Sequence, residues 1–425
     1  MKIHFMGIRG SGISGVAELS SKMGYEVTGC DLEEDASYKL ENISEISRGH
    51  DVNHIVDADL VVVSPAVFYQ NSENPEFLEA KKLNKLITWQ EFVSKYLQKE
   101  KEVICIAGTH GKSTTTAMSI KLLEDVGLDP IAVLGAKINS TNKSYRYGNG
   151  KYFIVEADEF FDNFLNYHPE IVILNNIEFD HPDYFKSEED VFESFEKFLN
   201  NLTGKKILIA NLEDKGVSKI LSKINLSNIT LIKYSLDTSS IDLKLKVLGK
   251  HNLLNAMGVV KLGEALEIKQ DIIKKSLESF EGVGRRLELV RDEDGIKIFD
   301  DYAHHPTAIK KTLAGVRNEY PKNRIWAIVE PHGFNRTNAL LSLYDGVFND
   351  VDKVIVGPIF KARDKDDFGL TSEIIAKKSK HTNAMGLNSF EKINEICKSE
   401  AKNGDIFIVM GAGKSYIWAQ KLLKN

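Results

Sequence analysis

The chain has 425 residues, enough for about three domains, and its 42% hydrophobic and 27% charged residues are ordinary for a soluble globular protein. A formal net charge of −6 argues against a general nucleic-acid binder, and no apolar run reaches the roughly 18 residues that predict a membrane span. Three distant cysteines, Cys30, Cys105 and Cys397, favour a reducing compartment and predict neither a disulfide framework nor a zinc site.

The N-terminal residues MKIHFMGIRG show no signal peptide, so we expect a cytoplasmic enzyme. After them, short apolar runs alternate with helical patterns along almost the whole chain, which is typical of parallel α/β units. The runs form three groups, each with several strands of the buried type and enough of them for its own core. We therefore predict an α/β fold of three domains, at 1–98, 99–287 and 288–425.

A glycine-rich loop, GIRGSGISG, follows the first predicted strand and opens the first predicted helix. Its glycines let the backbone approach a diphosphate, and the helix N-terminus supplies amide donors. The loop predicts a diphosphate-containing ligand, either a nicotinamide dinucleotide or a nucleotide sugar, and a tight turn without ligand is the alternative. Asp31 ends the next predicted strand and could equally be a cap or turn residue.

A second loop, GTHGKSTTT, lies between another predicted strand and helix. Its small residues and consecutive amides can surround a phosphate, Lys112 can reach the outer oxygens, and the hydroxyl of Ser113 or Thr114 could bind magnesium. The glycine usual in such loops is absent at Ile106 and stands at Gly108 instead. A glycine turn with capping hydroxyls is the alternative. MGAGKS near the C-terminus also lacks the early glycine and predicts only a strand-to-helix turn.

Polar residues follow the next predicted strands. Glu156 ends one strand, and His181, flanked by Asp180 and Asp183, follows another. Ligands gather at this edge of an open parallel sheet, where a carboxylate close to phosphates can hold magnesium. Farther along, GKHNLLNA offers amide and imidazole groups able to contact a base, although Asn252 could simply cap a helix.

Together these motifs resemble the Mur ligase family, the ATP-dependent amide-bond ligases of cell-wall peptide assembly. GTHGKS matches the family form G-T-x-G-K-[ST], and EADE, NNIEFDHPDY, GKHNLLNA, GVGRRLE and DDYAHHPT follow in family order. Many members carry a modified lysine fifteen residues after the aspartate of the Asp–His pair. Here Phe195 stands at that position, as expected for the branches that use L-alanine or a recycled tripeptide.

The resemblance implies a Rossmann-like N-terminal UDP-binding domain, a central P-loop ATPase-like domain with a mostly parallel sheet, and a C-terminal Rossmann-like domain. The implied reaction joins L-alanine, or a related amine, to the lactyl carboxylate of UDP-N-acetylmuramate in peptidoglycan precursor synthesis. That carboxylate attacks the γ-phosphate of ATP, and the amine then displaces phosphate from the acyl phosphate. The implied cofactors are ATP and magnesium, in a monomer or homodimer without nucleic-acid or membrane partners.

The resemblance also implies roles for individual residues. The catalytic residues would be Lys112, Glu156 and His181. The metal ligands would be Ser113, Glu156 and His181. The ATP-binding residues would be Gly108, Thr109, His110, Gly111, Lys112, Ser113, Thr114, His251, Asn252, Asn255, Arg286 and Asp301. The UDP-sugar-binding residues would be Gly7, Gly10, Ser11, Gly12, Asp31, His50 and Ser64. The amino-acid-binding residues would be Tyr302, His304 and Arg336.

The acceptor amine stays open in the segment EPHGFNRT. Members that use L-alanine commonly carry two arginines there, and Arg336 matches the second while Gly333 replaces the first. Arg363 could supply the missing guanidinium. HHPTAI and FEGVGRRLE are instead more similar to the branch that joins a tripeptide. A non-catalytic nucleotide-sugar sensor is an alternative of another class, which the intact Lys112 disfavours.

Overall fold

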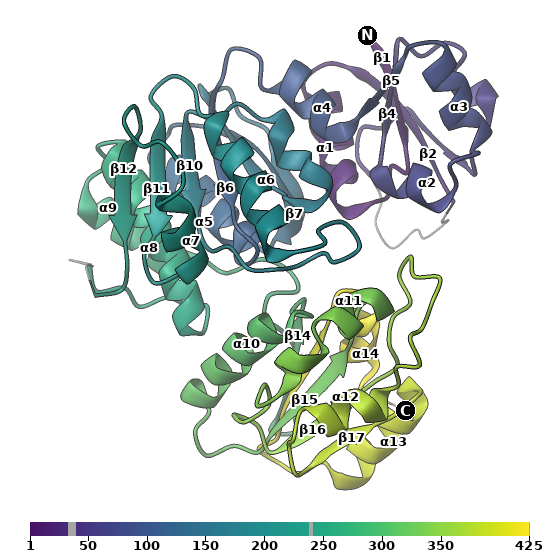
Figure 1. Cartoon of the computed structure of the whole chain (residues 1–425), viewed down its shortest axis with the longest axis vertical. Helices are drawn as coiled ribbons and strands as arrows, with labels where there is room; N and C mark the ends of the chain where they lie inside the picture. The colour runs from purple at the N-terminus through teal and green to yellow at the C-terminus, as the bar shows by residue number, and fades with distance from the viewer. Residues whose placement is uncertain (33–39, 238–240, 425) are drawn as a thin grey trace. The chain divides into compact units, whose positions relative to one another are not determined.

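Three β-sheets follow one another along the chain (Figure 1). The computed structural model describes residues 1–32, 40–237 and 241–424. The first two sheets belong to one unit, Met1–Ile177, Phe192–Ile241 and Ala256–Leu277. The third belongs to a second unit, Glu178–Val191, Asp242–Asn255 and Glu278–Asn425. The predicted α/β fold is confirmed, whereas the domain boundaries at 98 and 287 stay a prediction.

The first sheet is parallel throughout, in the order β3-β2-β1-β4-β5. Its strands are β1 Lys2–Met6, β2 Glu26–Asp31, β3 Glu45–Arg48, β4 Leu60–Val63 and β5 Leu86–Thr88. The helices are α1 Ser11–Lys22, η1 Val52–Ile55, α2 Pro65–Gln70, α3 Pro75–Lys82, α4 Trp89–Phe92 and η2 Val93–Leu97. The strand order reverses between β1 and β4, and ligands of open parallel sheets bind at the carboxyl edge beside such a reversal.

The second sheet has the order β12-β11-β10-β6-β9-β7-β8, and only the β7–β8 pair is antiparallel among its described pairs. Its strands are β6 Glu102–Ala107, β7 Ile131–Ile138, β8 Lys143–Arg146, β9 Tyr152–Ala157, β10 Ile171–Leu174, β11 Ile207–Asn211 and β12 Thr230–Tyr234. The helices are α5 Lys112–Asp125, η3 Phe160–Asn166, α6 Glu188–Asn200, α7 Lys215–Leu221, α8 Lys250–Ala265 and α9 Gln270–Ser279. The central strands β6 and β10 are almost wholly buried, which explains their continuous apolar sequences.

The third sheet has the order β13-β14-β18-β15-β16-β17, with β13 antiparallel to β14. Its strands are β13 Glu288–Glu293, β14 Ile296–Asp301, β15 Ile325–Glu330, β16 Lys353–Val356, β17 Ala384–Gly386 and β18 Ile406–Gly411. The helices are α10 Pro306–Glu319, α11 Phe334–Ala339, η4 Leu341–Tyr344, α12 Ser372–Lys378, α13 Phe390–Glu400 and α14 Ser415–Lys421. MGAGKS begins in β18 and ends at the first residue of α14, so the predicted strand-to-helix turn is confirmed.

Both faces of the third sheet are buried, and strand β15 contributes apolar side chains to each face. Ile325 and Ala327 belong to one apolar cluster, while Trp326 and Ile328 belong to the other. Successive side chains of a strand point to opposite faces, so an unbroken apolar strand is needed between two helical layers. Among the described ranges, no helix has both the length and the apolar character needed to cross a bilayer.

Candidate active site

The predicted phosphate loop lies between β6 and α5, and its first glycine is required by a close approach. Gly108 has φ +135°, and a Cβ there would lie 2.9 Å from the carbonyl oxygen of Asn176. Gly111, with φ +82°, precedes α5 in the left-handed conformation. The first residues of α5 are Lys112, Ser113 and Thr114. Only glycine fits at 108, which gives a physical reason for its place in this loop.

Two asparagines that the sequence analysis did not single out hold this loop. The amide of Thr109 donates to the Asn176 carbonyl (3.1 Å), and the amide of His110 donates to Asn176 Oδ1 (2.7 Å). Asn176 Nδ2 donates back to the His110 carbonyl (2.9 Å), and Asn175 Nδ2 donates to Thr115 Oγ1 (3.0 Å). Both asparagines directly follow β10, which pairs with β6. The signal available in the sequence was a pair of polar residues directly after a buried strand.

Lys112 is held inside the loop by oxygen atoms. Its Nζ donates to the Gly108 carbonyl (2.7 Å) and to Glu159 Oε2 (2.6 Å), and it lies 3.9 Å from Asp158 Oδ1. Burial alone would lower the pKa of Lys112, but the Glu159 and Asp158 carboxylates raise it, so the side chain stays a cation. An incoming phosphate would therefore compete with Glu159, a buried partner that the sequence analysis missed.

Two of the three predicted metal ligands are in contact. Ser113 Oγ donates to Glu156 Oε1 (3.0 Å), and the Gly135 amide donates to Glu156 Oε2 (2.7 Å). A hydroxyl and a carboxylate side by side are the oxygen ligands that magnesium prefers. The third, His181, belongs to the second unit, where its Nε2 lies 3.9 Å from Asp180 Oδ2.

The predicted UDP-sugar residues lie at the carboxyl edge of the first sheet. Gly7 directly follows β1, Asp31 ends β2, and Ser64 directly follows β4. A Cβ on Gly7 would lie 3.1 Å from the Ser64 Cβ, and the Arg9 amide donates to Asp31 Oδ2 (2.9 Å). At the start of α1 lie Gly10, Ser11 and Gly12. The structure thus brings these residues together at the predicted edge.

His50 follows β3, but its imidazole is already in contact with other side chains of the protein. Its Nδ1 lies 3.0 Å from Glu76 Oε2 and 3.2 Å from Cys30 Sγ, and its side chain is 8% exposed. Little of the ring is therefore open to a ligand. Its UDP-sugar role stays a prediction.

In the second unit, the predicted base-contacting residues begin α8. His251, Asn252 and Asn255 occupy its first two turns. Asn252 Nδ2 donates to the Leu248 carbonyl (2.7 Å), and Asn255 Nδ2 lies 3.3 Å from Asn252 Oδ1. Asn252 thus donates to the backbone just before the helix, whereas a helix cap would accept from the first amides of the helix. The second Nδ2 hydrogen of each side chain leaves a donor for a base.

Asp301 holds the backbone at the end of β14. Its Oδ2 accepts from the Leu287 amide and its Oδ1 from the Ala303 amide, each at 2.7 Å. Burial raises the pKa of Asp301, against the effect of the nearby Arg286. The Arg286 guanidinium lies 4.8 Å from the centre of the Tyr302 ring, a cation–π contact. Asp301 therefore acts as a strand-end cap, and its predicted nucleotide contact would use its remaining lone pairs.

Arg336 and His304 belong to a buried polar cluster. Arg336 forms an ion pair with Asp180. Burial and the charge of Arg336 hold the pKa of His304 well below its usual range. Burial, with Arg336 and then Arg363, lowers the pKa of His332 to about 4. Both imidazoles are therefore neutral at neutral pH. That Arg363 supplies the missing guanidinium stays a prediction.

Gly333, where an arginine was expected, has a conformational reason to be glycine. Its φ is +78°, in the left-handed region, and a Cβ there would lie 3.2 Å from Asp364 Oδ2. Asp364 accepts from the amides of Phe334 and Asn335 at the start of α11. An arginine would strain the turn that begins α11.

Three models of the Mur ligase family match the chain. They are described as Mur ligase family, catalytic domain, over residues 2–98; Mur ligase middle domain, over residues 106–244; and Mur ligase, glutamate ligase domain, over residues 285–413. Together the matched segments account for most of the chain, in the order in which the three sheets occur.

Relatives of known name match over the full length. The UDP-N-acetylmuramate–L-alanine ligase of Clostridium tetani is 36% identical, covering 100% of this chain and 98% of the relative. The enzyme of the same name from Aquifex aeolicus is 32% identical, covering 100% and 97%. Among solved structures, the UDP-N-acetylmuramate–alanine ligase of Thermotoga maritima has a TM-score of 0.79 at 26% identity, covering 100% and 98%. A murein peptide ligase from Psychrobacter arcticus has a TM-score of 0.71 at 26% identity, with the same coverage.

Proposed function

This chain belongs to the Mur ligase family, and we propose that it joins L-alanine to the lactyl carboxylate of UDP-N-acetylmuramate at the expense of ATP. It is an ATP-dependent ligase, as its relatives are. The observation that carries the proposal is the full-length similarity to ligases named for this reaction. The ordered phosphate loop, with a cationic Lys112 beside it, supports the same chemistry.

The phosphate loop supplies the activation step. A carboxylate and a triphosphate repel each other, so the reaction needs positive charge where the γ-phosphate is transferred. Lys112 supplies one such charge when phosphate oxygens replace Glu159 as its partners. Ser113 and Glu156 fit a magnesium ion, which when bound would neutralise further phosphate charge, and His181 is proposed as an additional ligand.

The carboxyl edge of the first sheet is the proposed site for the UDP-sugar. Gly7 lets the loop after β1 pack closely against Ser64 after β4, and α1 points its N-terminal amides to the same edge, where a diphosphate could accept from them. The proposed domain boundaries remain those at 98 and 287.

The second unit is the proposed source of the acceptor site. Arg336 is the candidate guanidinium for the acceptor carboxylate, although it is paired with Asp180 in this structure. Because their pKa values are lowered, the imidazoles of His304 and His332 stay neutral, so each can accept a hydrogen bond from the incoming amine but is a weak base toward an ammonium group. A tripeptide acceptor is the second candidate, favoured by HHPTAI and FEGVGRRLE, which are more similar to the branch that joins a tripeptide. Gly333 leaves the segment without one of the arginines usual in members that use L-alanine.

An ADP-release assay with purified chain, ATP, magnesium and UDP-N-acetylmuramate tests the proposal. L-alanine, glycine, L-serine and the tripeptide are supplied in parallel, and we expect release to require both the sugar nucleotide and L-alanine. Lys112→Ala should lower the rate by at least about 100-fold. Lys121→Ala removes a partly exposed lysine of the same helix, paired with Asp125, and should leave the rate unchanged. ADP release without any amine, or full activity of Lys112→Ala, would contradict the proposal.

A further inference from the structure

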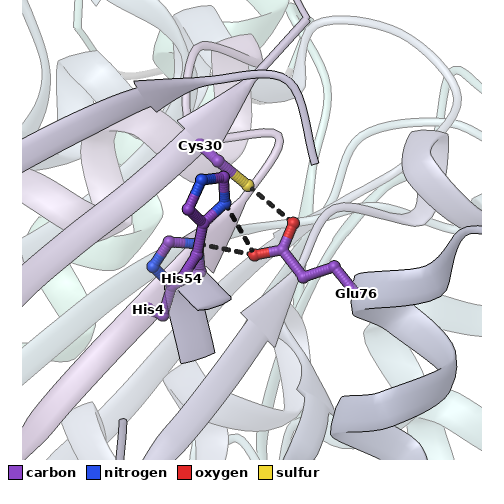
Figure 2. A group of neighbouring side chains, drawn as sticks. All are labelled: His4, Cys30, His54 and Glu76. Carbon is purple, nitrogen blue, oxygen red and sulfur yellow. Dashed lines mark hydrogen bonds and ion pairs between the residues drawn. The ribbon is translucent and has the colours of Figure 1, made fainter. Parts of the chain in front are cut away.

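Four side chains of types that can hold a metal ion meet among the elements of the first sheet, and the proposed ligase chemistry uses none of them. They are His4, Cys30, His54 and Glu76 (Figure 2). They come from four separate elements, β1, β2, η1 and α3. One ligand atom from each lies within 4.8 Å of all the others.

Glu76 is the centre of this cluster. Its Oε1 lies 3.0 Å from His4 Nε2 and 3.4 Å from His54 Nδ1, and its Oε2 lies 3.2 Å from Cys30 Sγ. Figure 2 shows the rings and the thiol directed toward the two carboxylate oxygens. With ordinary zinc bond lengths, donors in a tetrahedral shell lie about 3.3–3.6 Å apart. The separations of Glu76 from the other three donors are close to this range, whereas the widest separation in the cluster, within 4.8 Å, must shorten to enclose one ion.

The cluster is shielded from water. His4 is 1% exposed, and Cys30 and Glu76 are both 0% exposed. In the part of the chain that the structure describes, neither His4 Nε2 nor Glu76 Oε1 has a partner with hydrogen-bond geometry, despite their short separation. Buried polar atoms left in this way are rare, and a shared cation between nitrogen and oxygen would satisfy both.

The surrounding contacts orient the donors as in a metal site. His4 Nδ1 lies 2.9 Å from Thr28 Oγ1, which fixes the ring and leaves Nε2 directed at Glu76. His50 Nδ1 bonds Glu76 Oε2 from another side. Outer hydrogen bonds of this kind fix the tautomer and orientation of ligating histidines.

We propose that His4, Cys30, His54 and Glu76 bind a divalent transition-metal ion of the zinc class. Two imidazole nitrogens, a thiolate and a carboxylate suit zinc or cobalt, whereas magnesium requires mainly oxygen donors. Binding displaces the Cys30 thiol proton to solvent, so that the sulfur coordinates as thiolate. Four protein donors, three of them buried, fit a structural site, which leaves no position for substrate.

The ion would link the strand ends that carry the candidate UDP-sugar residues. Cys30 directly precedes Asp31, and Glu76 contacts His50. The site therefore deepens the proposed function by stabilising one wall of the nucleotide-sugar pocket. The metal itself can be assayed without substrate, so failure of this inference is distinguishable from failure of the ligase assignment.

Cobalt substitution provides the test. The full chain is stripped with a chelator, dialysed, and titrated with Co²⁺ in the absence of nucleotide and magnesium. We expect a thiolate-to-cobalt charge-transfer band and the strong visible bands of tetrahedral cobalt, saturating at one equivalent and lost on addition of Zn²⁺. Cys30→Ser should abolish the charge-transfer band. Cys397→Ser, which removes a buried thiol from the second unit, is the matched control and should keep it.

Circular dichroism checks whether Cys30→Ser folds. A second variant keeps the test decisive if it does not. His54→Gln changes the most exposed member of the cluster, whose side chain is 17% exposed, and should weaken Co²⁺ binding at least about 10-fold. Zn²⁺ should raise the unfolding temperature of the wild-type chain more than that of His54→Gln. Absence of stoichiometric Co²⁺ binding, or a spectrum unchanged in Cys30→Ser, would overturn the inference and leave a metal-free hydrogen-bond network around Glu76.

Discussion

Replacing Gly108 by alanine tests the physical reason given for the unusual phosphate loop. The backbone there has φ +135°, and the added Cβ would lie 2.9 Å from the carbonyl oxygen and 3.0 Å from the nitrogen of Asn176. Both obstructing atoms belong to backbone, so no side chain can rotate away. The loop must move, and the Thr109 amide that bonds the Asn176 carbonyl moves with it.

The size of the effect follows from two contributions. A side chain in a backbone conformation that disfavours it costs about 1–2 kcal/mol. Forcing an extra methyl group against fixed atoms costs a further 1–3 kcal/mol, roughly. Gly108→Ala should therefore lower the free energy of unfolding by about 2–5 kcal/mol. It should also weaken ATP binding, because the amides proposed to surround the phosphate lose their positions.

Gly127→Ala is the matched control. Gly127 follows the same helix, α5, and has φ +73°, but a Cβ there would meet nothing within 4 Å. It should cost only the conformational part, about 1–2 kcal/mol, with unchanged affinity for ATP. Urea unfolding and titration with a fluorescent ATP analogue measure both quantities. Equal destabilisation of the two variants, with ATP affinity retained in Gly108→Ala, would refute the close-approach argument.

Glu156→Gln keeps the shape of the candidate magnesium ligand but removes its charge. ADP release should therefore require at least about 10-fold more magnesium. An unchanged magnesium requirement would exclude Glu156 as a ligand. Arg336→Ala should lower the free energy of unfolding at neutral pH by about 3–5 kcal/mol, because it leaves the buried Asp180 carboxylate without its guanidinium. Burial opposes ionisation of Asp180, but Arg336 and nearby histidines hold its pKa well below the usual range, so the pair's contribution is present above the unfolded pKa of about 3.9. Urea unfolding should show the difference shrinking as the pH falls below that value, and a constant difference would contradict this linkage. Gly333→Arg restores the usual family arginine, yet should cost about 1–3 kcal/mol of unfolding free energy at a left-handed position beside Asp364 and should not lower the KM for L-alanine; a lower KM would show that the segment accommodates it.

The phosphate loop shows how far local order could be predicted. Strand β6, the loop and helix α5 are contiguous, so apolar pattern, glycines and lysine together predicted the whole unit. The partners of that loop could not be predicted in the same way. Asn176, which bonds His110, lies 66 residues farther along the chain, and Glu159 lies 47 residues after Lys112. The pairing of β10 and β9 with β6 brings them there.

The inferred metal site shows the opposite extreme. The cysteine pattern predicted no zinc site, because the three cysteines are far apart in the sequence and odd in number. The structure places His4 opposite Thr28 and Met6 opposite Cys30, so His4 and Cys30 share one face of the first sheet. Helix α3 then brings Glu76 onto that face. Such a site depends on strand register, which a single sequence does not specify locally.

By itself, the sequence determined the α/β architecture, the phosphate loop and the family, because these depend on contiguous patterns and on motifs in a fixed order. The tertiary structure decided which distant side chains meet: Ser113 with Glu156, Lys112 with Glu159, and Arg336 with Asp180. The tertiary structure also explains why position 108 is glycine. A Cβ there would collide with the backbone of Asn176, which is remote in sequence. Side-chain chemistry is local, but the distances that turn it into a site are set by how strands pair.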